Sequence, residues 1–128
     1  MLELKNITKV YEAGTTQVEA LKGINIAFRE NEFVAILGQS GCGKTTIINA
    51  IIKLFGEVRA RILLAAPTGR AAKRMAETSG REARTIHRLL ETGFDPHTGQ
   101  LVFTHDEYDP LKADAVIVDE VSMVDVPL

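Results

Sequence analysis

The chain has 128 residues, of which 45% are hydrophobic and 25% are charged, and its formal net charge is −2. This length suits one domain that buries about two-thirds of its unfolded surface, and the charge excludes an overall polybasic binder of nucleic acid or membrane. The single cysteine, Cys42, excludes an internal disulfide and suits a reducing, cytoplasmic location. We expect no membrane contact by this chain, since no apolar run approaches the roughly 20 residues of a membrane span.

The charge is unevenly distributed along the chain. Residues 57–91 carry eight Lys/Arg against four Asp/Glu, whereas residues 92–128 carry one Lys against eight Asp/Glu. The basic segment suits phosphate contacts, and the acidic segment suits a metal ion or no ligand at all. Solvated helix faces explain both segments equally well.

The first half of the chain predicts a hairpin, a buried strand and a helix. Residues 2–10 and 17–29 have the alternating pattern of strands and are separated by the turn sequence EAGTT. After a second turn, FVAIL (33–37) is a continuous apolar run, as expected of a strand covered on both faces. A Gly-rich loop follows, and the apolar spacing predicts a helix near residues 44–55 that ends at Gly56.

The second half predicts two more buried strands with helices between them. RILLAA (61–66) and ADAVIV (113–118) are the strand candidates. Helices are expected at 69–79, with Gly80 as the C-cap, and at 82–91. Residues 93–100 read as a loop, and LVF (101–103) reads as a minor strand at best.

Strands that alternate with helices indicate a parallel α/β core. We therefore expect one α/β domain over residues 1–128, with a mostly parallel sheet flanked by helices and an N-terminal antiparallel β-hairpin.

A complete phosphate-binding motif follows FVAIL. The pattern G-x-x-x-x-G-K-[ST] lets backbone N–H groups cradle phosphate oxygens, and the start of the following helix adds its positive dipole end. Lys44 supplies a mobile charge for the β- and γ-phosphates, and the Thr45 hydroxyl can ligate Mg²⁺. The predicted nucleotide-binding residues of this loop are Gly38, Gln39, Ser40, Gly41, Cys42, Gly43, Lys44, Thr45 and Thr46.

Two carboxylates follow the apolar strand AVIV. Asp119 suits a place beside Mg²⁺, and Glu120 suits a role in orienting a water molecule for attack on phosphate. With Lys44 they form the predicted catalytic set, and with Thr45 the aspartate forms the predicted metal site. An apolar strand that ends in Asp-Glu is by itself a weak signal, but 75 residues after the motif lysine it indicates the second half of a P-loop NTPase site.

From residue 43 onward the chain resembles the first motor domain of RecD-like superfamily 1 DNA helicases. The resemblance rests on "GKTTIINAIIKLF", "APTGRAA", "ARTIHRLLE" and "VDEVSMVD". It implies that Thr68, Gly69 and Arg70 lie along single-stranded DNA, and their hydroxyl, backbone and guanidinium donors suit phosphate contacts. Read without the family, Arg70 and Arg74 are exposed helix residues.

Residues 1–46 resemble instead the N-terminus of an ABC-transporter ATPase of the lipoprotein-export or macrolide-export type. The segment "LELKNITKVYEAGTTQVEALKGINIAFRENEFVAILGQSGCGKTT" carries this resemblance. It implies that Tyr11 stacks on adenine, which is chemically sensible for a flat base. The alternative is a tyrosine at a strand end that covers apolar surface.

Two P-loop lineages thus meet at the GKTT sequence that they share, which indicates a chimera of residues 1–46 and 47–128. In both families a further strand lies between the strand before the phosphate-binding motif (here FVAIL) and the strand before the Asp-Glu pair (here AVIV). We therefore expect AVIV to pair directly with FVAIL, another strand to fill the gap, or the core to be imperfect. The direct pairing is favoured. The expected function is binding of ATP or ADP with Mg²⁺ and at most weak ATPase activity. The alternatives are a DNA-binding helicase fragment, an ABC-type ATPase subunit and a fused scaffold without a partner.

Overall fold

The computed structural model describes residues 2–37 and 42–124. The chain divides into two compact units, residues 1–51 and residues 52–128, and each has its own sheets. Helix α1 (Lys44–Glu57) begins in the first unit and ends in the second.

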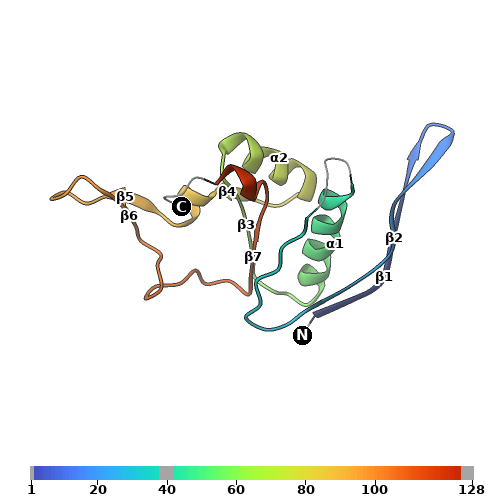
Figure 1. The fold of residues 1–128 in the computed structure, drawn as a ribbon, viewed down its shortest axis with the longest axis horizontal. Coiled ribbons are helices and arrows are strands. Elements are labelled where there is room, and N and C mark those ends of the chain that lie inside the picture. The colour runs from blue at the N-terminus through green and yellow to red at the C-terminus, as the bar shows by residue number, and fades with distance from the viewer. Residues whose placement is uncertain (1, 38–41, 125–128) are drawn as a thin grey trace. The chain divides into compact units, whose positions relative to one another are not determined.

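The first unit is built on an antiparallel hairpin, as predicted. Strands β1 (Leu2–Ala13) and β2 (Thr16–Phe28) pair from Leu2↔Phe28 to Ala13↔Thr16, and Figure 1 shows them as a long twisted ribbon. The ladder is irregular near Asn6, whose backbone has φ 51° and whose N–H donates to Asn25 Oδ1 at 2.8 Å. Such bulges increase the local twist of a two-stranded ribbon.

The predicted buried strand at residues 33–37 is wrong. These residues form no strand, and the side chains of Phe33 and Leu37 are 93% and 89% exposed. An apolar run becomes a buried strand only where neighbouring strands satisfy its backbone groups and helices cover its faces. In the described part of the chain no strand pairs with residues 33–37, so their apolar composition produces no strand.

The second unit contains a parallel sheet of three strands in the order β4-β3-β7. Strand β3 (Ile62–Ala66) is central and pairs with β7 (Ala115–Val118) and with β4 (Ala83–Thr85). Strands β3 and β7 confirm the predictions at 61–66 and 113–118. The favoured pairing of AVIV with FVAIL is wrong, because residues 33–37 form no strand; β7 pairs instead with β3 in the register Ile62↔Ala115 to Ala65↔Val118.

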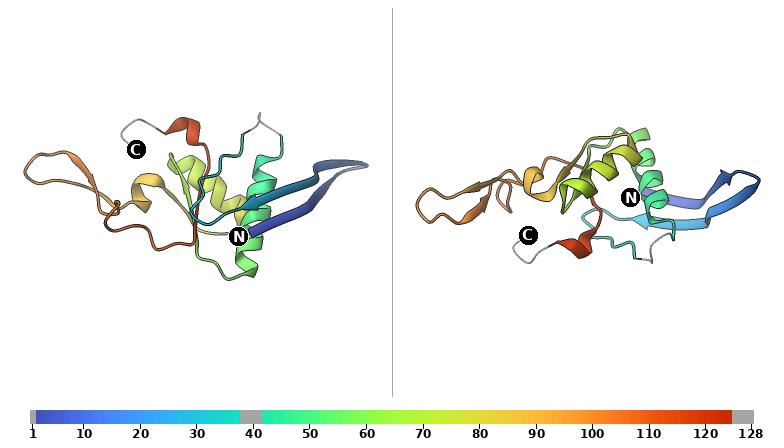
Figure 2. Two further views of the ribbon diagram at one scale, coloured as in Figure 1. Left: turned by 60° about the horizontal axis from the view of Figure 1, so that its bottom comes forward. Right: turned by 90° about the horizontal axis from the view of Figure 1, so that it is seen from above.

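Helix α2 (Gly69–Ser79) packs against β3 and β4, as Figures 1 and 2 show. Its C-cap is Gly80, as predicted, with φ 68° and an N–H that donates to Ala76 O at 2.9 Å. The buried residues of this unit come from α1, β3, α2 and the short helix α3 (Ile86–Leu89): Ile52, Leu64, Ala65, Ala66, Ala72, Met75 and Leu89.

The predicted helix at 82–91 is mostly wrong. Residues 83–85 form β4, which pairs with β3, and helix α3 covers only Ile86–Leu89. Thr85 is both the last residue of β4 and the N-cap of α3: its backbone is extended, and its side chain accepts a hydrogen bond from Arg88 N at 3.2 Å. A threonine that caps a helix in this way favours extended backbone over a continuous helix.

A small hairpin extends away from the three-stranded sheet (Figures 1 and 2). Strand β5 (Thr92–Phe94) pairs with β6 (Leu101–Phe103), so LVF forms the minor strand that was predicted, whereas the predicted loop at 93–100 begins inside β5. In the turn, Asp95 Oδ1 accepts hydrogen bonds from the N–H groups of His97 and Thr98 at 2.7 and 3.3 Å. These two bonds lower the pKa of Asp95 from its ordinary value. A short 3₁₀ helix (Val121–Met123) follows β7.

The α/β architecture is therefore confirmed, with a parallel sheet flanked by helices and an antiparallel hairpin at the N-terminus. No helix in the described ranges is both long and apolar enough to cross a membrane.

Candidate functional site

The phosphate-binding motif leads into helix α1. Gly38, Gln39, Ser40 and Gly41 lie outside the described residues. Cys42 is exposed, and Gly43 has φ 90°, a conformation that strongly favours glycine. Lys44 is the first residue of α1, and the helix begins with the bond from Ile47 N to Gly43 O at 3.0 Å.

Thr45 and Thr46 occupy the first turn of α1, where backbone N–H groups have no partner within the helix. Thr45 is exposed, and Thr46 is half-buried. The Thr46 hydroxyl lies 3.2 Å from the hydroxyl of Tyr11 on β1. The structure thus brings two predicted nucleotide-binding residues, Tyr11 and Thr46, into contact within the first unit.

Asp119 and Glu120 lie at the carboxyl end of β7. Asp119 is half-buried, its N–H donates to Ala65 O at 3.1 Å, and its Oδ1 accepts from Glu120 N at 2.9 Å. Glu120 is exposed and has φ 55°, an uncommon backbone conformation for a residue other than glycine. These two residues belong to the second unit and Lys44 to the first, so their predicted convergence on one nucleotide stays a prediction.

The residues predicted to contact nucleic acid lie after β3, at the same edge of the parallel sheet as Asp119. Thr68 is the N-cap of α2, and its side chain accepts from Ala71 N at 3.2 Å. Gly69 and Arg70 form the first turn of the helix, and all three residues are exposed. The Thr68 hydroxyl therefore stabilises α2 in the absence of any ligand.

The basic segment has a mixed electrostatic surface. Arg84 Nε lies 2.8 Å from Glu82 Oε1; this hydrogen bond and the guanidinium charge lower the pKa of Glu82, and the bond and the carboxylate charge raise the pKa of Arg84. The guanidinium of Arg81 lies over Gly56, in the last turn of α1, where a cation interacts favourably with the helix dipole.

An open groove of about 480 Å³, which no sequence pattern indicated, lies over β4, α3 and the start of β5. Its lining mixes arginine, acidic and polar side chains: Arg84, Thr85, His87, Arg88, Glu91 and Thr92. The apolar spacing of residues 82–91 signalled a helix and gave no sign of a strand, which is why the groove could not be foreseen.

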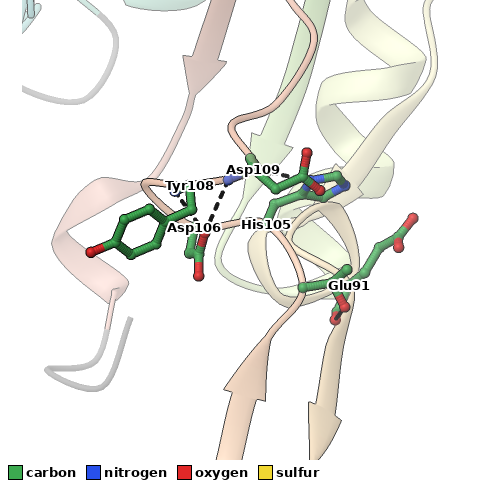
Figure 3. Close-up of polar contacts among 6 residues, drawn as sticks. Glu91, His105, Asp106, Tyr108 and Asp109 are labelled. Atoms are coloured by element: carbon green, nitrogen blue, oxygen red, sulfur yellow. Dashed lines mark hydrogen bonds and ion pairs between the residues drawn. The ribbon is translucent and has the colours of Figure 1, made fainter.

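The acidic segment uses its carboxylates to shape a loop. Asp106 Oδ1 accepts from the N–H groups of Tyr108 and Asp109 at 2.8 and 3.1 Å, and His105 Nδ1 lies 3.4 Å from Asp109 Oδ2 (Figure 3). Within residues 2–37 and 42–124, no group of three or more His, Cys, Asp or Glu side chains is arranged to hold a metal ion.

Known proteins of two kinds are similar to this chain. It is 40% identical over 94 residues to the ATP-dependent RecD2 DNA helicase of Deinococcus radiodurans. This match covers 73% of this chain and 12% of the helicase. It is 37% identical over 94 residues to an uncharacterized ABC transporter ATP-binding protein of Methanocaldococcus jannaschii, which covers 73% of this chain and 39% of that protein.

A third relative is the macrolide export ATP-binding/permease protein MacB of Hyphomonas neptunium, 47% identical over 51 residues, or 40% of this chain and 8% of that protein. The chain thus spans between 8% and 39% of the length of these relatives. The archaeal match is longer than residues 1–46, so the likeness to ABC ATPases extends past that segment.

The model of the AAA domain family matches residues 20–128, which include the phosphate-binding motif, α1, the parallel sheet and the Asp119–Glu120 pair. Both predicted resemblances, to helicases and to ABC ATPases, are confirmed by the relatives. The chain is a P-loop NTPase that belongs to the AAA domain family.

Proposed function

We propose that this chain binds ATP or ADP with Mg²⁺ at residues 38–46 and hydrolyses ATP slowly. The observation that carries the proposal is the arrangement of Gly43, Lys44 and Thr45: a glycine at φ 90° leads directly into the first turn of α1. Helix N-termini of this kind attract phosphate through unpaired N–H groups and the helix dipole.

The donor set suits Mg²⁺. The cation prefers hard oxygen ligands and is usually held by one or two protein groups together with substrate phosphates. The Thr45 hydroxyl and the Asp119 carboxylate are such donors, and Asp119 keeps its second oxygen when Oδ1 accepts from Glu120 N. When bound, Mg²⁺ neutralises charge on the β- and γ-phosphates.

Glu120 is the proposed base for hydrolysis. Water forms a bond to the γ-phosphorus, the bond to the β-phosphate oxygen breaks, and the Glu120 carboxylate accepts the proton. Its exposed carboxylate directly follows Asp119 after β7, which supports this assignment. Because the sequence supplies no arginine finger in a predictable position, we expect a rate on the order of 10⁻⁴–10⁻³ s⁻¹, as in unassisted GTPases.

The proposal extends to the origin and location of the chain. Relatives of two kinds support a chimera joined near residues 43–46, although the AAA domain match runs across that junction and the archaeal ABC match extends past it. The single exposed cysteine, Cys42, supports a reducing, cytoplasmic location. A natural relative with uniform identity along all 128 residues would contradict the chimera.

Contact with single-stranded DNA at Thr68, Gly69 and Arg70 is the second candidate function. The similarity to RecD2, a DNA helicase, and the exposure of these residues support it. The pairing of Arg84 with Glu82 supports instead the scaffold alternative, because it neutralises part of the basic segment.

Calorimetric titration with Mg-ATP tests the main proposal. Lys44→Ala should abolish binding, whereas Lys53→Ala, at an exposed position on the same helix, should leave the affinity unchanged. Equal affinity in the wild type and Lys44→Ala would mean that the loop has only a structural role.

Phosphate release then tests turnover in the wild type, Lys44→Ala and Glu120→Gln, with and without single-stranded DNA. We expect slow release that both substitutions reduce. A rate above about 1 s⁻¹, which is typical of dedicated phosphoryl-transfer enzymes, or strong stimulation by DNA would refute the weak-ATPase proposal and support the helicase alternative.

A further inference from the structure

The N-terminal hairpin contacts the start of helix α1 at two places. The hydroxyls of Tyr11 and Thr46 lie 3.2 Å apart. A Cβ atom at Gly43 would lie 3.0 Å from Ala20 O and 3.6 Å from Leu21 Cδ2, so β2 passes directly over the end of the motif loop. Leu21 is 2% exposed, which makes it part of the core of this unit.

The Tyr11 ring is also held at its face. The Lys9 ammonium lies 5.3 Å from the ring centroid, within the range of a cation–π interaction. Tyr11 is thus restrained at its hydroxyl by α1 and at its ring by its own strand, and 46% of its surface stays exposed.

Thr46 is the residue on which this restraint acts. A threonine in a helix divides between two χ1 rotamers, because its hydroxyl can bond either to the preceding turn or elsewhere. The Tyr11 hydroxyl favours the rotamer that faces the hairpin. This contact therefore links the hairpin to the first turn of α1, whose N–H groups are the proposed phosphate ligands.

We infer that Tyr11 acts on the nucleotide site through its phenol oxygen, as a positioning residue for Thr46 and the first turn of α1. This inference rests on the proposed binding of ATP or ADP at residues 38–46. This role differs from base stacking in the part of the ligand that is affected. A residue that acts through Thr46 changes the affinity for any ligand with the phosphate chain. A residue that stacks on a base changes the affinity only for ligands that contain a base.

Two ligands separate these roles: Mg-ATP, and Mg-tripolyphosphate, which has no base. Tyr11→Phe removes the phenol oxygen and keeps the ring, and Thr46→Val removes the partner hydroxyl at nearly constant volume. We expect Tyr11→Phe to weaken both ligands by the same factor, about two- to tenfold, the range for one hydrogen bond. Tyr108→Phe, at an exposed tyrosine of the second unit, is the control and should leave both affinities unchanged.

The double variant supplies a readout that a merely structural role would not change. If the two hydroxyls act as a pair, Tyr11→Phe causes no further loss in the Thr46→Val background. Denaturation midpoints of the same proteins show whether the folded state is weakened as a whole. If the two substitutions lower affinity and stability independently, so that the effects add in the double variant, the inference is overturned.

The remaining outcomes are also decisive. If Tyr11→Phe weakens binding of ATP alone, or changes neither affinity, the inference is overturned. The proposed function is still supported in that case, provided that the wild type binds Mg-ATP and Lys44→Ala does not. A wild type that binds neither ligand would overturn both.

Discussion

Residues 33–37 and residues 62–66 are two apolar runs that precede a loop and a helix, yet only the second is a strand. In the second run, Leu64, Ala65 and Ala66 are buried, and β4 and β7 satisfy the backbone on both sides. In the first run, Phe33 and Leu37 are almost fully exposed. The difference lies in neighbours that are distant in sequence, and not in the composition of either run.

The comparison extends to the helix that comes after each run. Helix α2 begins with a threonine N-cap and ends with a glycine C-cap, and it packs on its own sheet. Helix α1 begins at the phosphate-binding motif, where a glycine at φ 90° takes the place of a capping side chain. The second unit therefore has the features of a stable core, and the first has the features of a ligand-binding loop.

The largest expected effect compares the two apolar runs directly. Leu64→Ala should destabilise the protein by about 2–4 kcal/mol, because it leaves a cavity in the buried core. Phe33→Ala should change stability by no more than about 0.5 kcal/mol, as expected of an exposed side chain. Urea denaturation followed by circular dichroism measures both.

If Phe33→Ala were as destabilising as Leu64→Ala, residues 33–37 would be buried in solution and the contrast between the two runs would be lost. Phe94→Ala, at another exposed phenylalanine, shows what an exposed position contributes.

Local signals in the sequence predicted the elements that depend on local chemistry. The hairpin β1–β2 was predicted from alternation and turn residues, helix α2 from its Ala-rich composition, and the end of α2 from Gly80. Strands β3 and β7 were predicted because short apolar runs are typical of parallel sheets.

Pairing between distant segments could not be predicted in the same way. Residues 83–85 have helix-forming neighbours, but their pairing with Leu64–Ala66 makes them a strand. Likewise, the motif residues were predicted by their spacing, whereas the contact between Tyr11 and Thr46 depends on the packing of the hairpin beside the start of α1. Spacing gives the identity of a candidate site, and tertiary packing gives its contacts.

An intermediate effect compares the glycines at the starts of the two helices. Gly43→Ala should destabilise the first unit by about 1–3 kcal/mol, because an alanine at φ 90° is strained and its Cβ would lie 3.0 Å from Ala20 O. Gly69→Ala, in the first turn of α2, meets no atom within 4 Å and should stabilise by about 0.4–1 kcal/mol. Thermal denaturation measures both changes in stability. Equal effects of the two substitutions would mean that the backbone is no more constrained at Gly43 than at Gly69.

The smallest expected effect concerns the hairpin β5–β6, which lacks the burial of the parallel sheet and is held by its turn. Asp95 accepts two backbone hydrogen bonds, and these lower its pKa from the ordinary value of 3.8. A lowered pKa in the folded state means that the carboxylate contributes stability above the pKa of the unfolded chain. That contribution is lost as the pH falls through the pKa of the folded state.

A pH titration of the Asp95 side-chain carbonyl carbon by NMR should therefore have its midpoint below 3.8. Asp95→Asn keeps an oxygen acceptor without the charge, so the stability difference between the wild type and this variant should shrink as the pH falls through the same range. A midpoint at or above 3.8 would mean that the turn does not form in solution. In that case cross-strand pairing alone would hold β5 and β6 together. Two exposed strands would then form without a stabilising turn or burial, whereas the comparison of residues 33–37 with 62–66 implies that a strand needs buried neighbours.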